Sequence, residues 1–426
     1  MTHCLFAIQL SNYDRNGVYH LHADSSWNMT QNKLREMLRI DPEFTADVLV
    51  PLEKDVAIQP EVLTKDIPGI ERVTFLRQGL PPNAARTRYD FRYQEISDLL
   101  RSRPKYTHVY IMDPMHVRNY KAIFHLDLKY RPKFICNSHF IDDPSNPVVG
   151  EEIQYWYGQV EGHIKADLNV WQCSAAQKVF EDAARKSGFS SSLVDSIIAK
   201  SYAWDAGYSH TEMSAPIDEA RATRRFLRSI PKDKIVVFAP NRVGGALNGQ
   251  FRSSDYTNVG KFLFEIVPEV WKKRQDFCVI AGNPNQKITN TELEEHVPGY
   301  LRLLEDGIFE REEYLYVARN SDIVIGFFSV DSYGGTGVRE CTDQGCMPLF
   351  TDCYEQHTML EACNWPKELR VAKDFSNAID AFEKTLDYVK QRGRHNQLQK
   401  QMCDYVIKNA AFENTTEFAM KSMGMI

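Results

Sequence analysis

The sequence predicts an α/β fold made of two Rossmann-like domains that face each other across a cleft, followed by a C-terminal helical tail. Short apolar runs alternate with amphipathic stretches along the chain, which is the pattern of parallel sheets covered by helices. A polar segment at residues 205–221 interrupts this pattern, which then restarts. The chain has 426 residues, a length expected of two domains.

The first half is expected to alternate between strands and helices. Strands are predicted at 3–10, 46–51, 107–114, 133–140 and 168–174, and helices at 32–40, 91–103 and 175–188. The strands at 107–114 and 133–140 run into polar turns, and residues 192–204 close this half. We therefore assign residues 1–210 to a first domain.

The second half repeats this arrangement. Strands are predicted at 234–240, 277–282, 322–328 and 346–350, and helices at 258–274 and 310–321. The helix at 258–274 should be interrupted or kinked at Pro268. We assign residues 211–400 to a second domain and residues 401–426 to a C-terminal helix that packs back toward the first. Ligands of such folds bind at the C-terminal ends of the parallel strands.

The composition is that of an ordinary globular protein, with an apolar fraction of 43% and a charged fraction of 25%. The chain has no run of about 18 apolar residues and no basic segment ahead of an apolar start, so we expect neither membrane binding nor a signal peptide. Nine cysteines are scattered from Cys4 to Cys403 without a CxxC pair. We therefore expect reduced thiols in the cytoplasm and no metal site.

The stretch SYGGTGVRECTDQGCMPLF at 332–350 is the most site-like part of the second half. It follows a predicted strand and leads into a helix that should start near Gly337. Glycines allow a close backbone approach to a ligand, and a helix N-terminus suits a phosphate. Glu340 could accept hydrogen bonds from two vicinal hydroxyl groups, as in a ribose. The alternative is a glycine turn with a helix-start Glu that complements the helix dipole.

The order of elements around this stretch, YLYVARNSDIVIGFFS followed by GGTGVRECTDQGCMPLFTD, resembles the C-terminal signature of GT-B glycosyltransferases. The resemblance implies that Glu340 binds the ribose of a nucleotide-sugar donor and that the loop backbone meets the diphosphate. The donor residues that it suggests in this stretch are Gly334, Gly335, Thr336, Gly337, Arg339 and Glu340. Many retaining members carry another carboxylate where this chain has Ser332, so the stereochemical outcome stays open.

A second segment, KIVVFAPNRVGG at 234–245, resembles the first strand of the nucleotide-binding half of the same fold. There the strand ends in a polar loop with a basic residue near the donor phosphates. Arg242 is the residue expected to do this, with Arg252 as a further possibility, and either could instead be a surface arginine. The chain has no Asp-x-Asp metal motif. We therefore expect a UDP-sugar as co-substrate, no cofactor and no catalytic metal.

The first domain is expected to bind the acceptor and to supply the catalytic base. In FICNSHFIDDPSNP at 134–147, His139, Asp142 or Asp143 could take the proton of the acceptor hydroxyl. Asp113 follows the neighbouring predicted strand and is a further possibility. The alternatives are structural: His139 could be a packed histidine, and Asp142 and Asp143 could be turn residues before a proline.

Residues 72–133 contain thirteen Lys or Arg but only five Asp or Glu, in a chain whose net charge is −6. In the first half a short strand ends in a polar turn followed by a proline, and in the second half an FRS phrase at 251–253 precedes a helix that contains FLF at 262–264. This layout is similar to that of viral glycosyltransferases that modify hydroxymethylated pyrimidines in DNA, and the similarity implies a host cytoplasm as the location. The phosphate contacts would come from Arg86, Arg88, Arg92 and Arg118. Aromatic residues at 89, 91, 93, 106, 110 and 120 would stack on bases. The alternative is a solvated basic face with a glycan, lipid or small-molecule acceptor.

Two other classes also fit parts of the sequence. A nucleotide-sugar 2-epimerase of the same fold would share the donor site, and a non-catalytic binding protein would share the fold without turnover. A Rossmann dehydrogenase fits poorly, because neither half carries G-x-G-x-x-G after its first strand with an acidic residue about twenty positions later.

Overall fold

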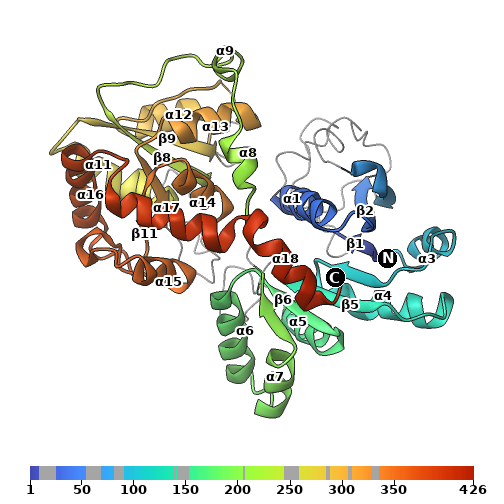
Figure 1. Cartoon of the computed structure of the whole chain (residues 1–426). Helices are drawn as coiled ribbons and strands as arrows, with labels where there is room; N and C mark the ends of the chain where they lie inside the picture. Colours follow the sequence, from blue (N-terminus) through green and yellow to red (C-terminus); the bar gives the residue numbers. More distant parts are fainter. Residues whose placement is uncertain are drawn as a thin grey trace. The chain divides into compact units, whose positions relative to one another are not determined.

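The computed structural model describes residues 1–8, 25–53, 69–80, 91–138, 141, 153–204, 207–243, 259–284, 288–305, 309–327 and 335–426. These residues form two compact units (Figure 1). The first unit comprises Met1–Gly207 together with Phe412–Ile426, and the second comprises Tyr208–Ala411. The domain boundaries predicted from the sequence are at residues 210 and 400. Each unit is an α/β structure built on a parallel sheet, as the sequence predicts.

The first unit contains a seven-stranded parallel sheet with the order β3-β2-β1-β4-β5-β6-β7. The order reverses between β1 and β4, and in such sheets the crevice at this switch point is where ligands bind. The strands are β1 His3–Ala7, β2 Thr45–Glu53, β3 Val73–Leu80, β4 His108–Ile111, β5 Lys133–Ser138, β6 Leu168–Trp171 and β7 Ser201–Ala203.

The α-helices that the structure describes in the first unit lie around this sheet (Figure 1). They are α1 Ser25–Ile40, α3 Tyr93–Arg101, α4 Val117–Ala122, α5 Ile153–Lys165, α6 Ser174–Lys186, α7 Ser191–Ile198 and α18 Phe412–Met423. The C-terminal helix α18 packs against α1, and the chain end is attached to the sheet. Thr2 Oγ1 donates a hydrogen bond to the Met425 carbonyl at 2.7 Å, and Lys133 Nζ donates one to the Met423 carbonyl at 2.8 Å.

The second unit contains a four-stranded parallel sheet with the order β11-β10-β8-β9. Its strands are β8 Ile235–Val243, β9 Phe277–Pro284, β10 Ile323–Gly326 and β11 Met347–Phe350. Its helices are α8 His210–Ser214, α9 Glu219–Ala222, α10 Val259–Lys261, α11 Val267–Trp271, α12 Asn290–His296, α13 Arg311–Arg319, α14 Thr336–Asp343, α15 Tyr354–Ala362, α16 Ala378–Arg392 and α17 Gln397–Ala410.

The interruption predicted at Pro268 is confirmed. The residues after α10 form a π-helical turn, Phe262–Ile266, and α11 begins directly after it with Pro268 in its first turn. The Val267 N–H bonds to the Phe262 carbonyl five residues back. Proline has no N–H and its ring clashes with the carbonyl four residues earlier, so a regular α-helix cannot run through this position.

The strands β4, β10 and β11 are buried along their whole length and mostly apolar, which is why they appear in the sequence as continuous hydrophobic runs. In the second unit Val237, Ile323 and Ile325 are among the residues of the core. Across the residues that the structure describes, no helix combines the length and the hydrophobicity that a bilayer crossing needs.

Candidate donor site

The helix α14 begins at the end of the glycine stretch that follows β10, as the sequence predicts. Gly335 caps this helix with a φ of 70°, a conformation that side chains larger than hydrogen rarely adopt. Gly334 lies outside the described residues. The confirmed positive φ shows that the backbone here needs a glycine to turn from the strand into the helix.

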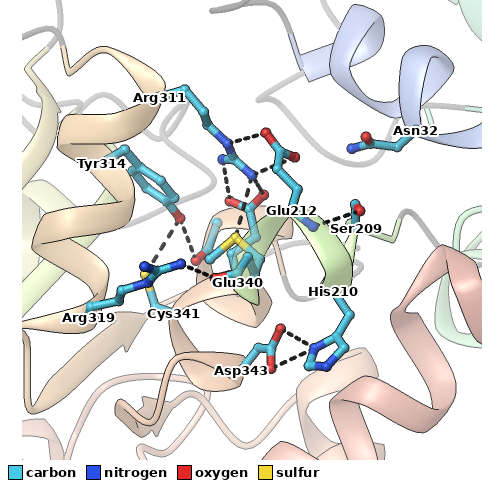
Figure 2. Close-up of polar contacts among 12 residues, drawn as sticks. Asn32, Ser209, His210, Glu212, Arg311, Tyr314, Arg319, Glu340, Cys341 and Asp343 are labelled. Carbon is cyan, nitrogen blue, oxygen red and sulfur yellow. Dashed lines mark hydrogen bonds and ion pairs between the residues drawn. The ribbon is translucent and has the colours of Figure 1, made fainter. Parts of the chain in front are cut away.

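The first turn of α14 lies against two neighbouring elements. A Cβ atom on Gly337 would come within 3.2 Å of the Tyr314 hydroxyl and 3.4 Å of Pro240 Cβ. Tyr314, on α13, donates a hydrogen bond to the Gly337 carbonyl at 2.9 Å (Figure 2). Pro240 belongs to β8. The glycine therefore permits a close approach of α14 to α13 and β8, which fixes where the helix starts.

Glu340 lies in the second turn of α14 and is 6% exposed. Arg311 of α13 holds its carboxylate with two parallel hydrogen bonds, from Nη2 to Oε1 at 2.7 Å and from Nη1 to Oε2 at 3.2 Å (Figure 2). Such a bidentate pair fixes the plane of a carboxylate as well as its charge. Glu340 is therefore an oriented carboxylate at the start of a helix, next to the C-terminal edge of the sheet.

Arg311 also binds a second carboxylate, that of Glu212 on α8. Arg311 Nε lies 2.9 Å from Glu212 Oε1, and Nη2 lies 3.1 Å from Oε2. Burial by itself would lower the pKa of the Arg311 guanidinium, but the charges of Glu340 and Glu212 and their hydrogen bonds outweigh it and raise the pKa well above its ordinary value. One permanent cation thus connects two acidic groups from different helices.

The other predicted donor residues are placed less directly. Thr336 is the first residue of α14. Arg339 is 1% exposed. The contact of either residue with a diphosphate stays a prediction. The sequence predicts Arg242 in a loop after the strand, but β8 continues to Val243, so Arg242 lies in the strand itself. Its backbone faces Asn283 of β9, past a register shift. Arg252 lies outside the described residues.

The predicted base residues of the first domain are mostly beyond what the structure describes. His139, Asp142 and Asp143 lie outside the described residues. Asp113 is 4% exposed, and its carboxylate accepts a hydrogen bond from the Met115 N–H at 3.1 Å, capping a short 3-10 helix. This contact gives Asp113 a structural role, and its catalytic role stays a prediction.

The basic segment at 72–133 is less available to a polyanion than its charge suggests. Arg86 and Arg88 lie outside the described residues. Arg92 Nη1 lies 3.3 Å from Glu95, and Arg118 Nη1 lies 3.3 Å from Glu161. Other cations of the segment are also engaged: Arg101 with Asp98, Arg103 with Asp47, Lys121 with Asp167, and Arg72 with backbone carbonyls of residues 38, 41, 42 and 44.

Three of the six aromatic residues predicted to stack on bases do not fit that prediction. Tyr106, Tyr110 and Tyr120 are 3%, 1% and 4% exposed, because their rings pack in the interior of the first unit. Tyr106 also donates a hydrogen bond to Asp47. Rings in these positions cannot stack on an extruded base. Tyr89 lies outside the described residues.

Possible metal ligands do not converge in the described ranges. No three His, Cys, Asp or Glu side chains there are grouped so that they could hold a metal ion. Cys341 and Cys346, which begin the C-terminal group of cysteines, lie in the apolar core of the second unit.

The sequence reasoning missed Arg311, Glu212 and Tyr314. A signal for Arg311 was present, because it stands at the first position of α13, flanked by Glu310 and Glu312. The helix dipole disfavours a cation at this end, so an arginine there needs a compensating partner. The partners, however, are 29 and 99 residues away in the chain, and only the fold brings them together.

Solved structures similar to this chain share its whole length. HepE of Anabaena in complex with UDP-glucose matches with a TM-score of 0.62 at 12% identity, covering 100% of both chains. The α,α-trehalose-6-phosphate synthase of Burkholderia multivorans matches with a TM-score of 0.62 at 11% identity, covering 100% of this chain and 99% of that one. A glycosyltransferase of Rickettsia africae matches with a TM-score of 0.63 at 11% identity, covering 100% and 98%.

The chain has the GT-B fold. The resemblance seen in the sequence is thereby confirmed at the level of the fold, whereas the similarity to viral DNA glycosyltransferases is not supported. No protein-family model matches the chain, and no curated protein sequence matches it.

Proposed function

We propose that this protein is a glycosyltransferase that takes a sugar from a nucleotide-sugar donor, a UDP-sugar, and transfers it to a hydroxyl group. The fold supports this proposal, since its structural neighbours include proteins in complex with UDP and with UDP-glucose. The observation that carries the proposal for this chain is the buried, arginine-oriented carboxylate of Glu340 in the second turn of α14.

The chemistry of this helix suits a nucleotide diphosphate. A carboxylate accepts hydrogen bonds at about four lone-pair positions, and Arg311 uses two of those on Glu340. The remaining positions match the two vicinal hydroxyls of a ribose. The N-terminal N–H groups of α14 carry the positive end of the helix dipole, which attracts the diphosphate.

The reaction would proceed by displacement at the anomeric carbon. The bond between this carbon and the donor's phosphate oxygen breaks, and a bond to the acceptor oxygen forms. The acceptor proton passes to a base, for which the sequence predicts His139, Asp142 or Asp143. The negative charge that develops on the leaving diphosphate would be stabilised by helix N–H groups and arginine, and we propose that no divalent ion is required.

We favour a sugar or another small hydroxyl compound as acceptor over duplex DNA. Three of the aromatic residues expected to stack on bases are buried, and Arg92, Arg103 and Arg118 pair with carboxylates of this chain.

Mass spectrometry of reaction products tests the proposal. The protein is incubated in EDTA with a panel of UDP-sugars, each with mono- and disaccharide acceptors or with DNA that contains 5-hydroxymethylcytosine. A hexose or pentose mass increment on a saccharide, with stoichiometric UDP release, is the expected result. An increment on DNA would overturn the acceptor assignment, and a C2 epimer of the donor without transfer would indicate an epimerase. No donor consumption with any UDP-sugar would contradict the proposal.

A further inference from the structure

The position of Arg311 between two carboxylates suggests a role beyond packing. Its guanidinium binds Glu340 through both Nη atoms, and it binds Glu212 through Nε and Nη2 (Figure 2). Among the described residues, Arg311 is the only side chain that donates hydrogen bonds to Glu340. The plane of the Glu340 carboxylate is therefore set by Arg311, and the plane of Arg311 is set in turn by Glu212.

The side chain of Arg311 starts from a rigid point. It is the first residue of α13, and a capping box closes this end of the helix. The Glu310 N–H donates to the Glu313 carboxylate at 2.8 Å. The Arg311 guanidinium also lies over the Tyr314 ring, 5.3 Å from its centroid. A forked side chain anchored in this way holds its partner within a narrow range of orientations.

The same two helices are joined at a second point one turn away. Tyr314 donates to the Gly337 carbonyl, so residues 311 and 314 of α13 contact residues 340 and 337 of α14. About one turn further along α14, the carboxylate oxygen Oδ2 of Asp343 lies 2.9 Å from His210 Nδ1 of α8. Contacts at 337, 340 and 343, each three residues apart, fix both the position and the rotation of α14 about its axis.

We propose that Arg311 is a positioning residue for the donor, which turns the free lone pairs of Glu340 toward the two ribose hydroxyls while Glu212 holds Arg311 in register. This inference rests on the proposed function, because it assigns Glu340 to the ribose. Arg311 itself does not contact the donor in this scheme. A lysine at this position would keep one positive charge but could not bind both Glu340 oxygens and Glu212 in one plane.

Calorimetric titration with UDP and with 2′,3′-dideoxy-UDP tests the proposal. The dideoxy compound lacks the hydroxyls that Glu340 would bind but keeps the base and diphosphate. For the unchanged protein we expect UDP to bind roughly 10-fold more tightly, a ratio that corresponds to two modest hydrogen bonds. In Arg311→Lys this ratio should fall to about 1–3, while the affinity for the dideoxy compound stays the same.

Matched variants separate positioning from general structure. Arg319 lies on the same helix and binds the Met213 and Ala215 carbonyls near α8, but it does not touch Glu340. Arg319→Lys should keep the UDP preference of the unchanged protein. Glu212→Gln, which weakens the support of Arg311 and leaves Glu340 intact, should lower the preference part of the way, and it tests the proposal if Arg311→Lys does not fold.

Two results would overturn the positioning role. One is an equal loss of affinity for both nucleotides in Arg311→Lys, and the other is an unchanged preference in both Arg311→Lys and Glu212→Gln. Glu340→Gln identifies the origin of a failure. If Glu340→Gln loses the UDP preference and the Arg311 and Glu212 variants keep it, only the positioning role fails. If Glu340→Gln keeps the preference, the assignment of Glu340 to the ribose fails, and the positioning role fails with it.

Discussion

Both units contain, among their described residues, a buried carboxylate held by the forked side chain of an arginine, and the two pairs differ in what else the carboxylate binds. In the first unit Arg103 binds Asp47 through Nε at 2.7 Å and Nη2 at 2.9 Å. In the second unit Arg311 binds Glu340. Asp47 also accepts a hydrogen bond from the Tyr106 hydroxyl at 2.5 Å, whereas the structure shows no hydroxyl donor to Glu340 among the described residues.

Their places in the fold explain the difference. Asp47 is the third residue of β2, near the N-terminal end of its strand, where parallel sheets do not bind ligands. Glu340 lies in the helix that follows β10, at the C-terminal edge where they do. The same type of ion pair therefore connects a strand to neighbouring residues in the first unit, and in the second unit it orients a carboxylate that can accept hydrogen bonds from a ligand. Removing Asp47 should affect stability without affecting donor binding, whereas removing Glu340 should affect donor binding.

The largest expected effect is the loss of stability in Asp47→Ala. The substitution leaves Arg103 and the Tyr106 hydroxyl without their partner, and breaking a buried ion pair costs about 3–5 kcal/mol of unfolding free energy. Urea unfolding followed by far-UV circular dichroism measures this loss. The KM for the donor in the folded variant should stay as in the unchanged protein. A loss below about 1 kcal/mol would show that Asp47 is not the structural member of the comparison.

The next effect concerns a buried histidine in the first unit. Burial lowers the pKa of His163 to about 4, against a hydrogen bond with Asn169 that raises it. Between pH 6.5 and 4 the unfolded chain binds a proton that the folded protein excludes, so stability is full above pH 6.5 and falls as the pH drops. The total loss from this residue is about 3 kcal/mol.

Urea unfolding at several pH values between 7.5 and 4.5 measures this dependence. His163→Gln should be less stable at neutral pH but should lose less stability on acidification, by about 1.4 kcal/mol per pH unit between the two pKa values. Equal slopes for the variant and the unchanged protein would mean that His163 is not buried in its neutral form.

A smaller effect is expected on catalysis by Glu340→Gln. The amide keeps the shape of the side chain but gives up the charge that attracts ribose hydroxyls and Arg311, and hydrogen bonds to charged groups contribute about 1.5–3 kcal/mol. The KM for the nucleotide sugar should therefore rise roughly 10-fold or more, with a smaller change in kcat. Steady-state kinetics with the active UDP-sugar measure both constants. Unchanged donor KM would remove Glu340 from the donor site.

The smallest effect is expected for Arg118→Ala. Arg118 is 65% exposed and pairs with a partly exposed Glu161, so the change in unfolding free energy should stay within about 0.5 kcal/mol. Transfer to a saccharide acceptor should be unchanged. A large drop in transfer that depends on salt concentration would revive the polyanion interpretation of this surface.

The sequence predicts those elements whose residues form a clear local pattern along the chain. Most strands, the glycine start of α14 and the place of Glu340 in that helix depend on neighbours in the chain, so the sequence pattern predicts them, whereas the role of Glu340 stays a prediction. The sequence pattern failed for β3 and α5, which were not predicted. In β3 the polar residues Arg77 and Gln78 stand among apolar ones, and in α5 aromatic residues are mixed with glycines, so neither shows a clean period.

Charge counting misled for a physical reason. The count of charges at 72–133 shows an excess of cations, but it leaves out the acidic residues from other parts of the chain that pair with them in the fold. Asp47, Glu161 and Asp167 lie outside the segment and pair with Arg103, Arg118 and Lys121 of it. The role of Arg311 was hidden for the same reason, because a tertiary ion pair leaves no periodic signal in the sequence.

A crystal structure with UDP bound tests the central claim most directly. The account predicts the ribose O2′ and O3′ atoms within about 2.5–3.0 Å of the two Glu340 oxygens, with both hydrogen bonds from Arg311 to Glu340 still in place. A ribose bound elsewhere, or an Arg311 that has left Glu340 to bind the diphosphate, would contradict it.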